Sequence, residues 1–324
     1  MLFAMKTQIF TPDQIEDAAA LIRNLEIVAF PTETVYGLGA SIFSVEAIQK
    51  IFLAKGRPQD NPLIAHIAHL DQIGLLTKEL PNTFYPLVEA FFPGPLTLVV
   101  KRADRVPEMA SGGLATIALR QPASELALGL IQAVGEPLVA PSANLSGRPS
   151  STSARHVLDD LEGRIAAVLD GGDSLIGIES TVLDLVSFSS PTILRPGGVS
   201  SGAIEAVLGR EVDHYSTGPK GSPGMRYRHY APKAPVKLFH SSEAFENYMV
   251  TAPPCRRLVL SQAISGHLPL EMKSFYATLR RADKEHYDEV VILAGLEQLD
   301  RGLANRIEKV IERNSQWLAL RQLP

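Results

Sequence analysis

Five clusters of polar side chains interrupt the apolar background of this sequence, and each contains groups that can bind anions. PTETVYGLG at residues 31–39 places two hydroxyls, a carboxylate and a phenol directly after an apolar run. KGRP at 55–58 places two cations around a glycine, followed by Asn61 and His66. Lys and Arg so placed can clamp phosphate oxygens. Lys55 and Arg57 are equally typical of the end of a helix that stops at a glycine, where cations complement the helix dipole. The sequence leaves both interpretations open, the phosphate clamp and the helix end.

The other three clusters also follow or precede predicted strands. Arg120 closes an apolar run, where a lone arginine often only faces solvent. APSANLSGRPS at 140–150 forms a rigid polar loop that can present donors to an anion. The last cluster joins DGG at 170–172, EST at 179–181 and RPGG at 195–198, each of which is also typical of a turn. Because open α/β sheets bind ligands at strand ends, we expect these clusters to share one site.

Composition excludes several classes of protein. Neither the P-loop motif nor the protein-kinase signatures occur, so a nucleotide site must be built in another way. The formal net charge of −4 argues against binding nucleic acid by bulk electrostatics. The single cysteine, Cys255, excludes a disulfide framework and a Cys-based zinc site. No run approaches the roughly 18 apolar residues of a membrane helix, so we expect a cytoplasmic protein without membrane association.

The elements that must position the clusters alternate along the first two hundred residues. Helices are predicted from Thr11, from Ser44, and at 84–92, 124–134, 152–162 and 201–208. Strands are predicted at 27–30, 63–67, 96–100, 116–119, 137–140, 166–169, 181–186 and 192–194. This alternation predicts an α/β fold in which helices cover a mixed sheet, but it does not predict the order of the strands.

The character of the sequence changes between residues 213 and 235, where proline, glycine and basic residues replace the periodic pattern. Such a stretch is typical of a linker or an ordered functional loop. The remaining elements predict a small unit of three strands and three helices. They are strands at 236–239, 258–260 and 290–293, and helices near 242–250, 272–283 and 301–313. No G-x-G-x-x-G follows its first strand, so no nucleotide site is assigned to this unit.

Taken together, the motifs resemble a known family. PTETVYGLG, KGRPQDNPL, FPGPLTLV, APSANLSGRPS, ESTVLDL and LRPGG occur in the order typical of the YrdC-type fold of threonylcarbamoyl-AMP synthases. MRYRHYAP is similar to the loop that leads into the C-terminal domain of the longer, two-domain members. The resemblance implies a YrdC-like twisted mixed sheet with helices at 1–212, a linker and active-site lid at 213–235, and a small Rossmann-like αβα domain at 236–324.

The implied activity is that of an L-threonylcarbamoyladenylate synthase, a nucleotidyltransferase. Such an enzyme makes threonylcarbamoyl-AMP and pyrophosphate from L-threonine, bicarbonate and ATP, with Mg²⁺ accompanying ATP, for tRNA modification. The reaction runs by positioning and charge stabilisation, so Lys55 and Arg57 are the expected catalytic residues and no side chain is assigned to a metal. Threonine or its carbamate is expected to contact Thr34, His66, Arg120, Ala140 and Ser180. ATP is expected to contact Arg57, Asn61, Thr116, Ser142, Asn144, Ser150, Arg195 and Tyr230.

Two alternatives remain at this point. One is an RNA-binding module of the same fold, which the net acidity disfavours. The other is a carbamoyl-transfer domain, which in known proteins belongs to longer chains with zinc fingers. For the synthase, a downstream threonylcarbamoyl transferase is a candidate partner and tRNA a weak or indirect one. Tyr230 is expected at the tip of the lid, which would close over the nucleotide and shield the product from water.

Overall fold

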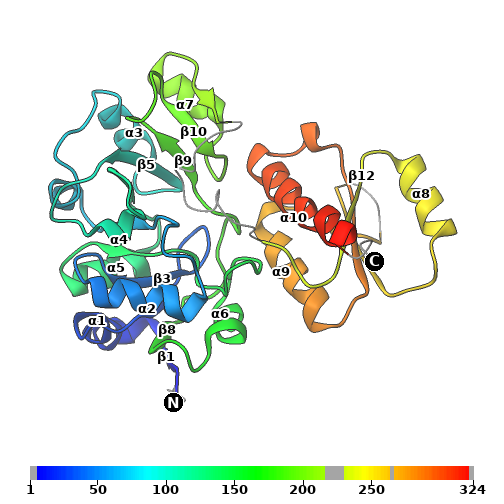
Figure 1. The fold of residues 1–324 in the computed structure, drawn as a ribbon, viewed down its shortest axis with the longest axis horizontal. Coiled ribbons are helices and arrows are strands. Elements are labelled where there is room, and N and C mark those ends of the chain that lie inside the picture. Colours follow the sequence, from blue (N-terminus) through cyan, green and yellow to red (C-terminus); the bar gives the residue numbers. More distant parts are fainter. Residues whose placement is uncertain (1–5, 216–229, 263–265, 321–324) are drawn as a thin grey trace. The chain divides into compact units, whose positions relative to one another are not determined.

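The computed structural model describes residues 6–215, 230–262 and 266–320, which form two compact units (Figure 1). The first unit comprises the described residues up to 215, except Gly147–Pro149. That short segment belongs to the second unit, together with the described residues from 230 onward. Within the part of the chain that the structure describes, no helix is long and apolar enough to cross a membrane.

The first unit is built on a mixed sheet of eleven strands. These are β1 (Gln8–Phe10), β2 (Val28–Phe30), β3 (Gly37–Ser41), β4 (Ile64–His66), β5 (Leu96–Lys101), β6 (Thr116–Arg120), β7 (Leu138–Val139), β8 (Ala167–Leu169), β9 (Thr181–Asp184), β10 (Thr192–Arg195) and β11 (Asp213–His214). Their order across the sheet is β1-β8-β2-β3-β7-β4-β6-β5-β9-β10-β11. Six of the ten neighbouring pairs join strands that are not consecutive in sequence, and the predicted mixed α/β sheet is confirmed.

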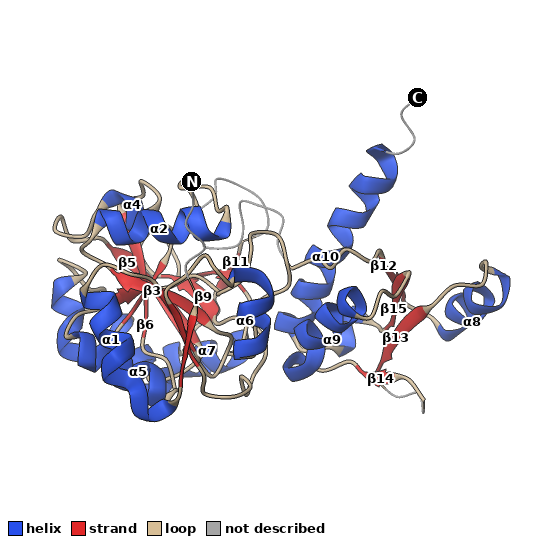
Figure 2. Cartoon of the chain, turned by 90° about the horizontal axis from the view of Figure 1, so that it is seen from below, coloured by secondary structure: helices blue, strands red, loops and turns tan. Residues whose placement is uncertain are grey.

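The helices of this unit lie on both sides of the strands. They are α1 (Ile15–Arg23), α2 (Val45–Lys55), α3 (Phe84–Phe91), α4 (Glu108–Ser111), α5 (Glu125–Val134), α6 (Ala154–Leu161) and α7 (Ser201–Leu208), with 3-10 turns η1 (Pro12–Gln14) and η2 (Leu70–Leu75). Figure 2 shows α2 and α4 on one side of the strands and α1 and α5 on the other. Every helix and strand predicted for this part of the chain is present, whereas β1, β3, β11, the short helix α4 and the 3-10 turn η2 were not predicted.

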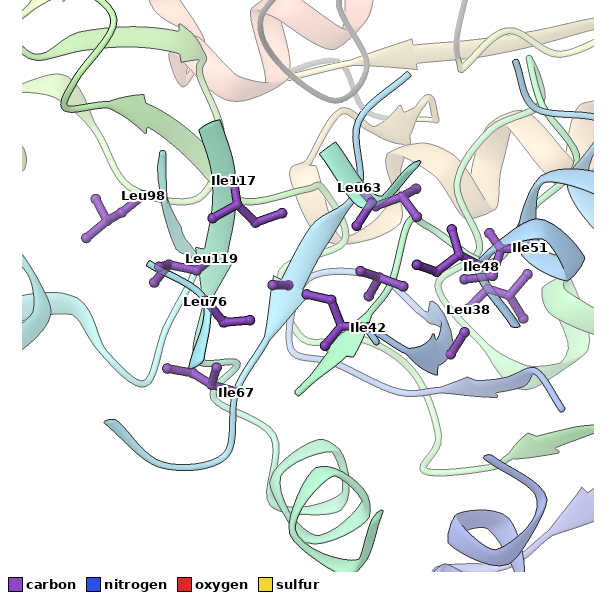
Figure 3. Packing of buried hydrophobic residues seen from close by; sticks show 14 of the residues in the cluster. Leu38, Ile42, Ile48, Ile51, Leu63, Ile67, Leu76, Leu98, Ile117 and Leu119 are labelled. Carbon is purple, nitrogen blue, oxygen red and sulfur yellow. The ribbon is translucent and has the colours of Figure 1, made fainter. Parts of the chain in front are cut away.

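One face of the sheet packs on the largest apolar cluster, part of which is shown in Figure 3. Ile48 and Ile51 of α2 contribute to it, as do Leu38 of β3 and Leu119 of β6. All four side chains are completely buried. Each such burial stabilises the fold by about 1.5–3 kcal/mol relative to exposure, so this face is the main source of stability in the first unit.

The opposite face is divided between two clusters. Over β1, β8, β2 and β7 it packs on α1 and α5, with Ile22 and Leu130 buried against Phe30. Over β4, β6, β5, β9 and β10 the cluster is small and consists of strand residues and Tyr215: Ile64, Val99, Ala118, Val182 and Leu194. Among the described residues, no residue of a helix belongs to that second cluster. The polar residues of the candidate site lie on this half of the face.

β3 shows why a glycine-rich segment forms a strand here. The sequence predicted no strand within PTETVYGLG. Instead Gly37 and Gly39 pair with Phe30 and Val28 of β2. A Cβ atom on Gly39 would lie 2.8 Å from the Phe30 ring, so only glycine allows this strand to cross the aromatic side chain so closely.

The second unit contains a parallel sheet of four strands. They are β12 (Val236–Phe239), β13 (Arg257–Ser261), β14 (Leu268–Pro269) and β15 (Glu289–Leu293), in the order β12-β15-β13-β14. The helices are α8 (Ser242–Thr251), α9 (Met272–Lys284) and α10 (Arg301–Leu320), with the 3-10 turn η3 (Leu296–Gln298). The prediction of three strands was wrong by one, because β14 has two residues and no hydrophobic pattern of its own.

A charged cluster lies where the strands of the second unit begin. Glu289 is 5% exposed, and the Tyr248 hydroxyl shares its one proton between the two carboxylate oxygens, at 2.7 and 2.8 Å. Lys237 forms an ion pair with it at 2.9 Å, and Arg257 forms a second. These partners lower the pKa of Glu289 to about 2 although burial acts in the opposite direction. The carboxylate is thus fully partnered within its own unit.

Candidate active site

The candidate site lies along the sheet face that carries the small strand cluster. Thr116, Ala118 and Arg120 alternate along β6, so their side chains share one face of that strand. Neighbouring β4 places His66 beside Arg120 in parallel register. The carboxyl ends of β4 and β6 therefore meet at the same edge. Thr116 lies at the opposite end of β6, so the predicted residues extend along the face and do not all share one edge.

Arg120 is held by three groups around its guanidinium. Its Nε donates to the Gly94 carbonyl at 3.1 Å, Nη1 to Thr34 Oγ1 at 2.9 Å, and Nη2 to Glu33 Oε1 at 2.6 Å. The Arg120 and Glu33 side chains are only 4% and 5% exposed, so this is a buried ion pair. Breaking such a pair by removing one partner costs about 3–5 kcal/mol, which makes Arg120 a rigid and fixed cation.

His66 is neutral in this environment. It is 3% exposed, and burial followed by the nearby charge of Arg120 lowers its pKa to about 3. Its Nδ1 lies 3.1 Å from the Ile64 carbonyl, which can only accept, so Nδ1 carries the proton. Nε2 of the neutral ring is therefore a hydrogen-bond acceptor rather than a donor.

Ser180 and Arg195 form a second group at the same edge. Arg195, which ends β10, donates to the Ser180 carbonyl from Nε at 3.2 Å and from Nη2 at 2.9 Å. The hydroxyl of Ser180 lies 2.8 Å from that of Thr97 on β5. Gly197 fixes the backbone here, because a Cβ atom on it would lie 2.3 Å from the Glu179 carbonyl oxygen. Any side chain at this position would push the Ser180 backbone out of place.

Lys55 stands at the end of α2, which begins with the capping hydroxyl of Ser44 and ends at Gly56 in the left-handed conformation, with φ of 60°. This helix C-cap is the structural alternative that the sequence left open. The ammonium of Lys55, 2% exposed, donates to the carbonyls of Ser142 and Asn144. It thereby ties the 140–150 loop to the helix, which indicates that Lys55 positions the loop. Its predicted catalytic contact with phosphate stays a prediction.

The remaining predicted residues lie around the start of β4 and in the same loop. Arg57 donates from Nη2 to the Pro62 carbonyl at 3.0 Å. Asn61 is completely buried, and its side-chain oxygen and nitrogen have no hydrogen-bond partner within the described part of the chain. The amide of Ala140 donates to the Ile64 carbonyl at 2.9 Å, which brings the loop beside β4. Buried Ser150 donates to a carboxylate oxygen of Glu179.

Tyr230 is the predicted site residue that belongs to the second unit. There it stacks on Tyr276, with ring centroids 5.5 Å apart, and the Arg306 guanidinium lies 5.3 Å from its ring centroid. Most of the expected lid, residues 216–229, lies outside the described residues. Tyr230 as a nucleotide contact, and the lid itself, therefore stay predictions.

Two residues at this edge, Glu33 and Thr97, were not among the predicted site residues. Glu33 forms the ion pair with Arg120, and Thr97 pairs with Ser180. Thr97 gave no signal, since a threonine inside an apolar strand is ordinary. Glu33 did give one, because a carboxylate between two threonines directly after an apolar strand is unusual. Among the described residues no group of three or more His, Cys, Asp or Glu is arranged to hold a metal ion.

Comparison with known proteins assigns the family. Residues 20–197 match the family model described as "Telomere recombination", and residues 199–310 match the one described as "Threonylcarbamoyl-AMP synthase, C-terminal domain". The threonylcarbamoyl-AMP synthase of Pyrococcus abyssi is 50% identical over 228 residues, 69% of this chain and 67% of that protein. The one from Schizosaccharomyces pombe is 36% identical over 362 residues, covering 92% of this chain and 88% of that protein.

A solved structure agrees with this. The crystal structure of P. abyssi Sua5 complexed with L-threonine matches with a TM-score of 0.87 and 39% identity, over 95% of this chain and 98% of that chain. Fold and site together define an α/β protein that carries fixed, buried cations at its mixed sheet. The chain belongs to the threonylcarbamoyl-AMP synthase family, as the motifs predicted.

Proposed function

We propose that the protein makes threonylcarbamoyl-AMP and pyrophosphate from L-threonine, bicarbonate and ATP. The observation that carries this proposal is the environment of Arg120. An arginine has five N–H donors, and three of these are engaged by Gly94, Thr34 and Glu33. Within the described residues, one donor on each terminal nitrogen is left over. A fixed guanidinium that offers two N–H groups is a natural partner for the carboxylate of an amino acid.

The same edge offers a place for the rest of the amino acid. Neutral His66 supplies an acceptor at Nε2, and the hydroxyl of Ser180, next to Thr97, supplies a group that can both donate and accept. Ala140 lies beside β4 through its backbone hydrogen bond. We propose that threonine and its carbamate occupy this edge, with the carboxylate on Arg120.

The polyphosphate of ATP needs positive charge, and the described cations suit that need. Arg57 and Arg195 are fixed by carbonyl groups, and Lys55 holds the 140–150 loop that carries Ser142 and Asn144. Two unit charges about 4 Å apart interact by roughly 4 kcal/mol at an effective dielectric of 20, so each phosphate contact contributes substantially. We propose that ATP lies along the face towards Asn61 and Thr116, and that Ser150 contributes from the loop.

Mg²⁺ is proposed to enter as the complex with ATP. This ion usually keeps several waters and binds phosphate oxygens with few protein ligands. An ion bound mainly by phosphate and water needs no protein cluster of ligands. Among the described residues, no group of three or more His, Cys, Asp or Glu side chains is arranged to hold a metal ion. When bound, the ion would neutralise charge on the phosphates, and the cations of the chain would orient them.

Pyrophosphate release by the purified full chain tests the proposed function. We expect release from ATP only when both L-threonine and bicarbonate are present. Omitting either co-substrate is the control. Nucleotide binding without threonine-dependent release would contradict the proposal and favour carbamoyl transfer or a binding role.

A downstream threonylcarbamoyl transferase is the proposed consumer of the product. Contact with tRNA is proposed to be weak or indirect. The proposed compartment is the cytoplasm, where ATP and tRNA meet.

A further inference from the structure

Glu33 has a buried carboxylate oxygen that the fold does not use. Its Oε1 accepts from Arg120 Nη2 at 2.6 Å, whereas Oε2 is inaccessible to solvent and has no hydrogen-bond partner within the described part of the chain. The residue as a whole is 6% exposed. A buried charged oxygen without a partner is strongly unfavourable, so such an atom in a folded protein calls for a donor from elsewhere.

The neighbouring groups do not supply that donor. The hydroxyl of Thr34 lies 2.8 Å from the hydroxyl of Thr32 and accepts from Arg120 Nη1. The Thr32 hydroxyl in turn lies 2.6 Å from the Val35 carbonyl. The backbone of Glu33 is also fixed, because its carbonyl accepts from the Ile176 amide at 2.8 Å. Glu33 Oε2 is therefore held in place without a donor from any residue that the structure describes.

The charges around this oxygen are complementary to an α-amino acid. Arg120 supplies a cation for a carboxylate, and Glu33 supplies an anion beside it. His66 is neutral and adds an acceptor, not a second positive charge. An ammonium group has three donors and no acceptor, so it needs the kind of surroundings that Glu33 and His66 provide. A ligand with only a carboxylate would leave Glu33 Oε2 unpartnered.

We propose that Glu33 Oε2 binds the amino group of threonine, while Oε1 positions Arg120 for the threonine carboxylate. This inference rests on the proposed function, and it adds a substrate-binding residue to it. Glu33 selects for a ligand that carries both an amine and a carboxylate. It also fixes the direction of the amine, which is the atom that must react with bicarbonate.

The experiment compares two ligands that differ only in the amine. L-Threonine and (R)-3-hydroxybutyrate share the carboxylate, hydroxyl and methyl groups, and the second lacks the amino group. Binding of each to the full chain is measured by calorimetry, without ATP. For the wild-type protein we expect threonine to bind at least tenfold more tightly, because a hydrogen bond to a charged group is worth about tenfold or more in affinity. Equal affinities would overturn the inference without any variant.

The variant Glu33→Gln keeps an oxygen that can accept from Arg120 and replaces Oε2 by an NH₂ donor. We expect it to bind threonine about ten- to a hundredfold more weakly and 3-hydroxybutyrate about as tightly as the wild type does. Retained binding of 3-hydroxybutyrate also shows that the variant is folded. Thr34→Val is the matched variant: it removes the other side chain on Arg120 and should weaken both ligands by a similar factor.

The outcomes distinguish a failure of amine binding by Glu33 from a failure of the proposed function. If Glu33→Gln weakens both ligands equally, or neither, Glu33 does not bind the amine, and the proposed function still stands. If the wild-type chain binds no threonine at all, both the inference and the proposed function are overturned. Pyrophosphate release over a range of threonine concentrations, with ATP and bicarbonate saturating, provides a second reading, in which we expect Glu33→Gln to raise the KM for threonine more than it lowers kcat.

Discussion

Glu33 in the first unit and Glu289 in the second are both buried carboxylates beside an arginine, yet their oxygens are satisfied very differently. Both carboxylate oxygens of Glu289 lie within hydrogen-bond distance of the Tyr248 hydroxyl, and Glu289 forms ion pairs with Lys237 and Arg257. Glu33 has one oxygen on Arg120 and one with no described partner. A fully partnered carboxylate is complete without a ligand, so it contributes to stability. A half-partnered one is a place for a ligand.

The positions of the two residues agree with this difference. Glu289 opens β15, and Lys237 and Arg257 lie at the beginnings of β12 and β13. Arg120 closes β6, beside the end of β4, at an edge where open sheets commonly bind ligands. A buried Glu–Arg pair thus stabilises the fold in the second unit and lies at the candidate site in the first. Substitutions at Glu289 should therefore change stability, and substitutions at Glu33 or Arg120 should change threonine binding.

The largest expected effect comes from Arg120→Gln. It removes the cation for the threonine carboxylate and leaves Glu33 buried without its ion pair, a loss worth about 3–5 kcal/mol. We expect kcat/KM for threonine in pyrophosphate release to fall at least a hundredfold. Arg257→Gln, which removes the corresponding arginine beside Glu289, is the control and should leave that constant within about twofold. Equal losses in both variants would remove the distinction between the two regions.

Next in size is Gly197→Ala. The new Cβ would lie 2.3 to 2.5 Å from backbone atoms of Glu179, Ser180 and Thr181, which cannot move aside without moving the site. We expect at least a tenfold loss of activity and a lower melting temperature. Gly295→Ala in the second unit is the control, since its Cβ would meet the end of the flexible Glu297 side chain at 2.6 Å. That variant should melt close to the wild type, and the opposite ranking would contradict the packing described here.

A smaller effect is expected for Glu289→Gln. The amide keeps an acceptor for Tyr248 but no longer balances Lys237 and Arg257, so the second unit should lose about 2 kcal/mol of unfolding free energy. Deuterium exchange of the β12, β13 and β15 amides measures this loss. The KM for threonine should stay within about twofold of the wild-type value. A large rise in that KM would show that Glu289 acts on the site and is not only structural.

The last expected difference between the units is in their response to mild acid. His66 has a pKa of about 3 in the fold against an ordinary 6.5, so the unfolded chain binds more protons below pH 6.5. The first unit should therefore lose stability as the pH falls from about 6.5 towards 3. Glu289 has a pKa of about 2 against 4.5, so its contribution is lost only between about pH 4.5 and 2.

Urea unfolding at a series of pH values, with each unit followed by a brief deuterium pulse and mass spectrometry, checks this order. Between pH 6.5 and 5, we expect the unfolding midpoint of the first unit to fall while that of the second changes less. His66→Asn, which does not titrate in this range, should flatten the response of the first unit. An unchanged slope in that variant would mean that His66 is not the group responsible.

The sequence by itself determined the helices, the apolar strands and the family. The helices could be predicted because their signals lie within a few residues, as in α2, which begins at a capping serine and ends at a glycine in the left-handed conformation. Strands with continuous apolar runs, such as β5, could be predicted for the same reason. The order of six motifs also identified the family, since no tertiary contact is needed to read that order.

Only the tertiary structure decided which residues meet. Arg120 and Glu33 lie 87 positions apart in the sequence, and their pairing depends on the order of the strands and on the loop after β2, which no local pattern encodes. β3 and β14 escaped prediction because glycines and a two-residue strand carry no hydrophobic period. Sequence patterns record how a segment buries its own apolar side chains. The unpartnered oxygen of Glu33 arises from packing among distant segments, and it becomes visible only when they are brought together.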